Sequence, residues 1–300
     1  MWLVWLVGLG PLLLALLGAV GVRFLTRESS PPLEGRVATA TALAGAVPAL
    51  VVAVLAVLWN WSLIAPASFV VPRVRYLVPL VLGVLAALAL MVPGRRPRTR
   101  ATAEVARRTV TSVLAVRDIV AVAALVVVVI VLSLVAGAAS EPDEEGRQLR
   151  FTMPAGTGST VSTTIYGWYF SLPALAVVAV LLATAVIAWT SVARPPWGDD
   201  VASDTAVRRA RCANITRVTC GALLVHLSYV LQSLHATVSL SAGVNTTEIG
   251  MVFFHTPLAV LAPVLQGAGL LALAGGLMLW LVTSLTALPV GARHGTVARS

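Results

Sequence analysis

Seven long apolar runs separate short polar segments along the 300 residues. Each run can cross the hydrocarbon core of a bilayer, which takes about 20 helical residues. Barrel strands would instead alternate over roughly ten residues, so a barrel is excluded. We therefore predict one polytopic, all-α integral membrane domain over residues 1–300, a bundle of seven transmembrane helices. The expected spans are Leu3 to Gly21, Val37 to Trp59, Val74 to Val92, Ile119 to Gly137, Ser171 to Val192, Val218 to Leu240 and Leu258 to Leu285.

The last span lies in a stretch, residues 249–288, that is too long for one comfortable crossing and tight for two. Pro257, Pro263 and several glycines interrupt it. We expect a short interfacial or broken helix over Met251 to Ala262, followed by one crossing helix. A helical hairpin is the alternative, and it would give eight spans and move the carboxyl terminus outside.

Arginine supplies every basic side chain, and its distribution predicts the orientation. Seventeen of the 21 arginines fall in alternating segments on one side, including the basic loops 93–118 and 193–217; the other side has Arg73, Arg75, Arg147 and Arg150. The positive-inside rule then places the amino terminus outside and the carboxyl terminus in the cytoplasm. The net charge of +9 thus comes from arginines at the ends of membrane spans, and we predict no nucleic-acid partner. The bias toward Ala, Val, Leu, Gly and Arg favours a bacterial plasma membrane.

Two kinds of polar segment flank the spans. Outside, residues 140–168 are expected to form an extracytoplasmic flap, with an acidic run at Glu141 to Glu145 and a strand at Thr160 to Tyr166. The acidic run could gather cations, although a solvated turn is the simpler interpretation. Inside, the two basic loops are expected to contact anionic headgroups or to dock a cytoplasmic partner.

Helix contacts are predicted where small residues recur at four-residue spacing. One such ridge contains Gly45 and another ends at Gly276. The fourth span carries no polar stripe and is expected to face lipid. Tryptophans, among them Trp280, are expected in the headgroup regions.

Several chemistries are excluded by missing residues. Without lysine the chain cannot form a retinal Schiff base or a P-loop for ATP. The metalloprotease, esterase, thioredoxin-like and dinucleotide motifs are absent as well. We expect no enzymatic chemistry of its own, and we interpret Cys212 and Cys220 as packing residues.

The sixth span carries polar side chains on two opposite faces, so it cannot face lipid and is expected to lie centrally or to line a water-filled cavity. His235 and His255 enter from the same outer side and could meet. Such a pair could bind a metal or haem or relay protons, or it could simply make interhelical hydrogen bonds. The candidate residues for a substrate path are His226, Ser228, Tyr229, Gln232, His235, Ser239 and His255.

Three functional hypotheses follow. The first is a permease-like membrane subunit of a transport system, with a cytoplasmic ATPase or another membrane subunit as its partner in trans. The second is a redox, metal-handling or haem-handling membrane protein that uses the outer histidines. The third is a membrane sensor or scaffold that reads the flap and signals through the basic loops.

Overall fold

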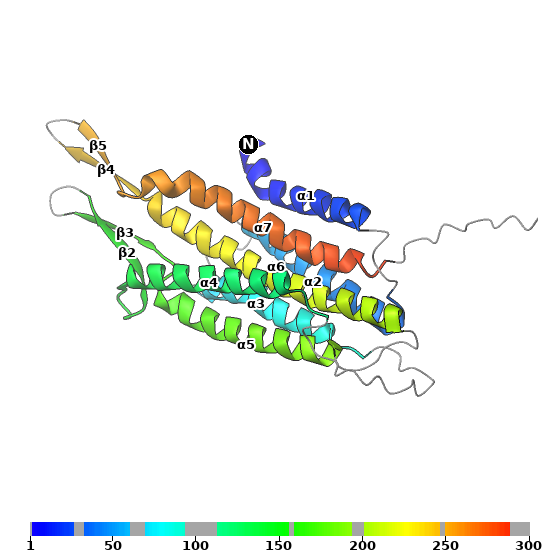
Figure 1. Ribbon diagram of the computed structural model, residues 1–300. Helices are drawn as coiled ribbons and strands as arrows, with labels where there is room; N and C mark the ends of the chain where they lie inside the picture. Colours follow the sequence, from blue (N-terminus) through cyan, green and yellow to red (C-terminus); the bar gives the residue numbers. More distant parts are fainter. Residues whose placement is uncertain are drawn as a thin grey trace, which may run out of the picture.

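The computed structural model describes residues 2–26, 33–60, 70–93, 113–155, 159–193, 201–246 and 250–288. In this part of the chain, seven α-helices form a bundle, and two small antiparallel sheets lie together at one of its ends (Figure 1). The helices are α1 (Trp2–Leu25), α2 (Gly35–Asn60), α3 (Val70–Ala89), α4 (Val116–Ala138), α5 (Trp168–Ala193), α6 (Val201–Val238) and α7 (Ala262–Leu285).

The helices have the length and composition of membrane spans. Among the described residues, five are long and apolar enough to cross a bilayer: α2, α4, α5, α6, and α7 with the turn before it. The apolar parts found in α1 and α3, Leu9–Leu25 and Val74–Ala89, are shorter. The expected all-α membrane class is therefore confirmed, and lipid contact follows from it.

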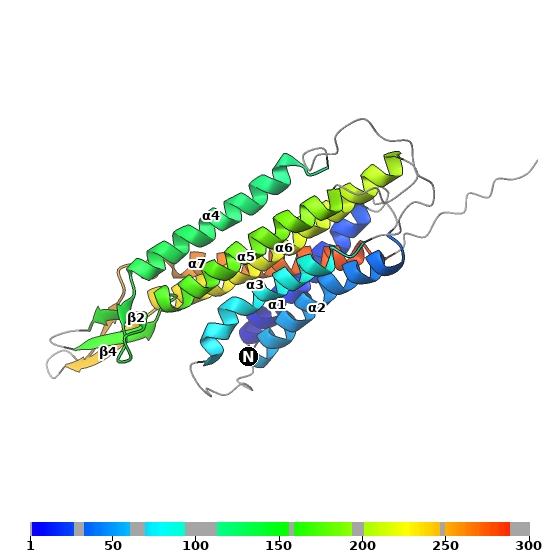
Figure 2. The ribbon, with the colours of Figure 1, turned by 90° about the horizontal axis from the view of Figure 1, so that it is seen from below.

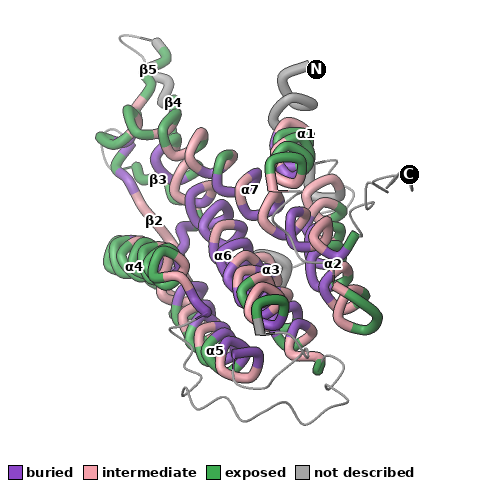
Figure 3. Tube along the Cα trace, turned by 45° about the vertical axis from the view of Figure 1, so that its right-hand side comes forward, coloured by how far each residue is buried: buried purple, intermediate pink, exposed green. Residues whose placement is uncertain are grey.

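Helix α6 is the buried axis of the bundle. It packs against α2, α3, α4, α5 and α7, and most of its residues are buried (Figure 3). By contrast, α4 lies along the outside of α5 and α6 and exposes a row of aliphatic side chains (Figure 2). The central position expected for the sixth span and the exposed face expected for the fourth are both confirmed.

The start of α6 corrects one prediction. The segment 193–217 was expected to be a basic loop, yet the helix begins at Val201 and continues through it without a break. Hydropathy places the start of the sixth span at Val218 and so omits the first turns of α6. The reason is that Asp204, Arg208 and Arg211 are charged although they lie inside the protein.

Glycines allow the closest helix contacts. A Cβ atom at Gly45 of α2 would collide with the carbonyl oxygen of Trp280, and one at Gly276 of α7 would lie 2.8 Å from that of Gly221 in α6. Both predicted ridges therefore supply a contact. Trp280 itself is fully buried and donates its indole Nε1–H to the carbonyl of Val218 at 3.1 Å. This side chain therefore contacts protein and not lipid headgroups.

The two sheets pack together at one end of the bundle, and we call them the outer cap, with outer and inner used in the sense of the orientation predicted from the arginines. One contains β1 (Glu141–Pro142), β2 (Gln148–Pro154) and β3 (Thr160–Thr164), and the other contains β4 (Ser241–Thr246) and β5 (Gly250–His255). Met153 and Ala155 of the first sheet region form an apolar cluster with Ala242 of β4, and Phe254 of β5 packs against it. The strand expected from Thr160 is confirmed.

The helix expected over Met251 to Ala262 is wrong. This segment forms β5 and a short 3-10 turn at Ala259–Leu261, which leads directly into the single helix α7. The β-branched and aromatic run Val252–Phe254 favours a strand, and Pro257 then ends it. Within the described residues 250–288 α7 is the only α-helix, so this stretch does not form the alternative helical hairpin.

Candidate functional site

A buried aromatic cluster joins the outer half of α6 to α3 and to the loop before α5. We call it the tyrosine–histidine cluster, and its members are Arg75, Tyr76, Tyr166, Phe170, His226 and Tyr229. The ring centroids of Tyr76 and Tyr166 are 4.7 Å apart, and those of Tyr76 and Phe170 are 5.3 Å apart. All of these side chains except Arg75 are buried.

His226 has a partner at each ring nitrogen. Its Nδ1 lies 2.9 Å from the carbonyl oxygen of Tyr76, and its Nε2 lies 3.3 Å from the hydroxyl of Tyr166. A carbonyl can only accept, so Nδ1 carries the hydrogen. In the neutral ring Nε2 then accepts, and Tyr166 donates its hydroxyl hydrogen. The buried imidazole is thus satisfied without a charge.

Tyr166 fastens the outer cap to the bundle. It lies between the end of β3 and the start of α5, and its side chain is fully buried against His226. Burial raises the pKa of Tyr166, and the interaction with Ser133 of α4 opposes only part of this rise. The phenol therefore keeps its hydrogen and remains a donor to His226.

Arg75 places a positive charge against two aromatic rings. Its guanidinium donates to the hydroxyl of Tyr76 at 2.9 Å, and its Cζ lies 4.9 Å from the centroid of the Tyr76 ring and 5.7 Å from that of Tyr229. Cations are attracted to the face of such rings. From the sequence, Arg75 contributed only to the arginine count that predicts the orientation. The signal that this count missed was an Arg–Tyr pair near the outer end of an apolar run.

The remaining α6 candidates make contacts along the helix and with α7. Gln232 donates from Nε2 to the hydroxyl of Ser228 at 3.0 Å. His235 has its Nδ1 2.9 Å from the carbonyl oxygen of Ala262 and 3.4 Å from the hydroxyl of Ser239. His235 therefore links the outer end of α6 to the first residue of α7.

His255 lies apart from this arrangement. It is exposed on β5, where it pairs with Ser241, and none of its hydrogen bonds joins it to His235. In the part of the chain that the structure describes, no group of three or more His, Cys, Asp or Glu residues is arranged to hold a metal ion. Cys212 and Cys220 are buried and unbridged. A metal or haem role for His235 and His255 stays a prediction.

At the opposite end, α6 carries a set of buried charged and polar side chains that we call the arginine clasp: Asp204, Arg208, Arg211 and Asn214. Arg208 pairs with Asp204 and donates to the carbonyl of Ala193 at 3.0 Å. Arg211 donates to the carbonyls of Leu90 at 3.0 Å and Val92 at 2.6 Å. The clasp thus bonds the ends of α5 and α3.

The same end is tied to α7 as well. Asn214 donates from Nδ2 to the hydroxyl of Thr286 at 3.0 Å, just after α7, and accepts from Arg217 at 2.6 Å. Arg23 of α1 donates to the carbonyl of Leu288 at 3.0 Å. The headgroup contact expected for this basic segment is therefore wrong for Arg208 and Arg211. The expected loop 93–118 falls mostly outside the described residues.

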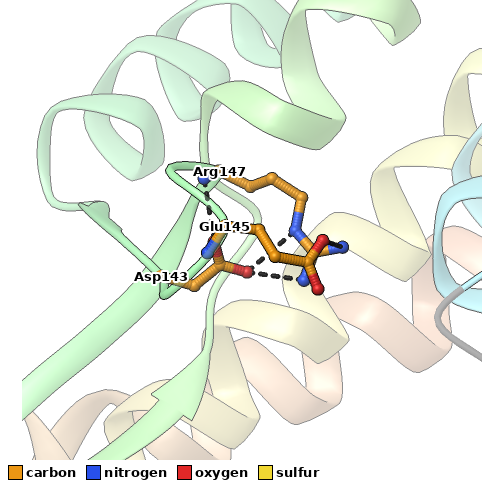
Figure 4. Close-up of polar contacts among 3 residues, drawn as sticks. All are labelled: Asp143, Glu145 and Arg147. Atoms are coloured by element: carbon orange, nitrogen blue, oxygen red, sulfur yellow. Dashed lines mark hydrogen bonds and ion pairs between the residues drawn. The ribbon is translucent and has the colours of Figure 1, made fainter.

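The acidic run Glu141 to Glu145 builds a turn. Asp143 accepts hydrogen bonds from the backbone N–H groups of Glu145 and Arg147, and its carboxylate pairs with the Arg147 guanidinium at 2.7 Å (Figure 4). Desolvation raises the pKa of Asp143, but these hydrogen bonds together outweigh it and hold the pKa below its ordinary value. Glu145 also pairs with Arg147 at 2.7 Å. The structure favours the turn interpretation over a cation site.

Comparison of the chain with models of protein families, with curated proteins and with solved structures finds no match.

Proposed function

We propose that this chain is a membrane subunit of a transport system, which moves or gates a substrate without an ATPase of its own. The observation that carries the proposal is the character of α6. This helix is buried among five others, bears polar side chains on two faces, and runs unbroken from the arginine clasp to the outer cap. Buried polar side chains are expensive in a membrane and commonly mark substrate or ion pathways.

The two ends of α6 suggest how such a subunit moves. The two hydrogen bonds of His226 in the tyrosine–histidine cluster are neutral, whereas the clasp contains the buried ion pair of Asp204 and Arg208. Neutral hydrogen bonds contribute less than charge-assisted ones, so they exchange partners more easily. Under this proposal the outer end opens while the inner end stays closed, and the partner acts on the inner end.

The proposed orientation has seven spans, an outer amino terminus and a cytoplasmic carboxyl terminus in a bacterial plasma membrane. The arginine distribution supports it, and the outer cap and the clasp lie at opposite ends of the bundle (Figure 1). Ser159→Cys and Ala202→Cys test it, because both positions are exposed and the natural cysteines are buried. In intact cells an impermeant thiol reagent should label the first and not the second. The reverse pattern would overturn the orientation.

The experiment for the function itself is partner capture combined with a transport assay. A photo-crosslinking residue at the exposed inner position Arg209 should capture an ATPase or a second membrane subunit in cells. Substrate candidates then come from the metabolites that accumulate or disappear in cells lacking the chain. When these cells are given the Gln232→Leu variant, the original metabolite levels should not return. The Ala236→Leu variant, changed at an exposed α6 position, should restore them. Capture of lipid alone, with both variants active, would contradict the proposal.

A sensor is the second candidate, and the outer cap is the observation that favours it. Two sheets from different loops pack as one unit, and Tyr166 connects that unit to α6. A sensor predicts that the Arg209 crosslinker captures a signalling protein. It also predicts that substitutions in the cap change the output while no solute moves across the membrane.

A further inference from the structure

The segment that joins the second sheet to α7 exposes a continuous run of large apolar side chains. Phe253 of β5 is 60% exposed, and Val260 in the 3-10 turn is 78% exposed. No Asp, Glu, Lys or Arg side chain lies among them, and the exposed His255 lies between Phe253 and Leu258 in the sequence. We call this surface the outer apolar patch, and its members are Met251, Phe253, Leu258, Val260, Leu261 and Val264.

The patch is separate from the core of the outer cap. Strand pairing sets Ala242 opposite Phe254, and these two side chains face the first sheet, where they meet Met153. Neighbouring residues of a strand point to opposite faces, so Phe253 points away from that contact. Where burial is described, Figure 3 shows β5 and the segment after it mostly in the exposed colour. The cap therefore does not account for the exposed face of β5.

The position of the patch indicates what covers it. The 3-10 turn leads at Ala262 into α7, which is long and apolar enough to span a membrane. Val264 and Leu271 on α7 are exposed apolar side chains of the same helix. A lipid-facing surface on α7 thus continues past the helix start onto the turn and β5. This continuity favours lipid over a protein partner.

We propose that the outer apolar patch inserts into the outer leaflet at the boundary between headgroups and acyl chains. An open sheet edge cannot enter the hydrocarbon core, because its N–H and C=O groups would lose water without gaining partners. The strands therefore lie at headgroup depth, and Val260 and Leu261 in the turn lie deepest. The patch anchors the second sheet laterally and sets the height of the outer cap above the bilayer.

The test uses single cysteines labelled with an environment-sensitive fluorophore in phospholipid nanodiscs. Phe253→Cys and Val260→Cys report on the patch, and Thr164→Cys, at an exposed position on β3, is the matched control. The unsubstituted chain gives the labelling blank, because its two cysteines are buried. Emission from the patch positions should shift to the blue. Lipids with a spin label near the top of the acyl chain should quench it, more strongly at 260 than at 253, and leave position 164 almost unchanged.

Equal and weak quenching at all three positions would overturn the proposal. A blue shift that survives in detergent and grows with protein concentration would also overturn it, in favour of a second copy on the patch. Phe253→Ser with Val260→Ser provides an independent check. These changes should weaken quenching of a label at Met251→Cys while leaving the melting temperature of the bundle nearly unchanged. Unaltered quenching at that position would contradict the anchoring role.

Discussion

The two ends of α6 both carry polar side chains inside the protein, but the chemical groups that form the hydrogen bonds differ between the ends. Both ends satisfy these side chains with backbone carbonyls of neighbouring segments. At the outer end His226 donates to Tyr76 and His235 to Ala262, and at the inner end Arg211 donates to Leu90 and Val92. The α6 groups that donate are imidazoles at the outer end and a guanidinium at the inner end.

Helix direction explains the difference. Helices α3 and α5 both begin at the outer end and finish at the inner one, so their terminal carbonyls gather around the clasp. Carbonyl ends of helices carry partial negative charge and favour cations, whereas the amino ends do not. Asp204 also suits its place, in the first turn of α6. Arg208 and Arg211 therefore lie beside helix ends inside the protein, where the sequence pattern alone predicts the membrane surface.

The largest effect is expected from Asp204→Ala. This change leaves the Arg208 guanidinium buried without its carboxylate, a situation that costs about 3–5 kcal/mol of unfolding free energy. The matched control is Asp118→Ala, which breaks the pair with the exposed Arg117 and should cost about 0–1 kcal/mol. The difference in unfolding free energy is measured by unfolding both variants in mixed micelles with increasing amounts of a denaturing detergent. Equal losses would mean that the clasp is no stronger than a surface pair.

Arg211→Ala should have the next largest effect. It removes the hydrogen bonds of a charged donor to two carbonyls at the end of α3, and the net loss should be about 1.5–3 kcal/mol of unfolding free energy. Arg209→Ala removes a neighbouring arginine that is exposed, and it should stay within about 0.5 kcal/mol of the original chain. The same micelle unfolding assay compares them. A destabilised Arg209 variant beside a stable Arg211 variant would reverse our assignment of the clasp.

At the outer end the expected cost is smaller. Tyr166→Phe removes one neutral donor from His226 and keeps the tilted contact with the Tyr76 ring, so it should destabilise by about 0.5–1.5 kcal/mol. A double-mutant cycle with His226→Phe isolates the bond, because the two changes should be less than additive. Strict additivity would show that the two side chains do not interact.

The smallest effect concerns acid titration of the turn at Asp143. Because the folded pKa lies below its ordinary value of 3.8, the stabilising contribution is present above 3.8 and is lost as the pH falls through the lower folded value. The amide resonances of Glu145 and Arg147, which bond to Asp143, should therefore titrate with a midpoint below 3.8. Arg147→Gln should move the midpoint upward. A midpoint at or above the ordinary value in the original chain would contradict the arrangement in Figure 4.

Sequence patterns predicted the bundle well and the polar contacts poorly, for a physical reason. Length and hydropathy identify the helices, because a helix that crosses a bilayer must be long and apolar. The four-residue spacing of small residues identifies Gly45 and Gly276 as positions of close helix contact. The β5 strand was missed because its apolar run fits a helix equally well. Local pairing with Ser241 to Thr246 decides it, and pairing is not visible in one strand alone.

The candidate site was predicted only in part. Two-sided polarity correctly placed α6 in the centre, and His226 was among its named residues. Its partners come from elsewhere: Tyr76 lies 150 positions away and Tyr166 lies 60 positions away. The periodicity of α6 gives no information about partners that lie so far away in the sequence. The arginine clasp was missed for the converse reason, because charge was interpreted as exposure.

The most direct test of the central role of α6 is photolabelling with a small apolar carbene precursor dissolved in the bilayer. Exposed positions of α4, such as Val120, Val127 and Leu134, should carry the label. Residues 212–230 of α6 should remain unlabelled, because neighbouring helices enclose them. Labelling of this part of α6 as strong as that of α4 would contradict its position as the enclosed polar axis, and with it the proposed transport role.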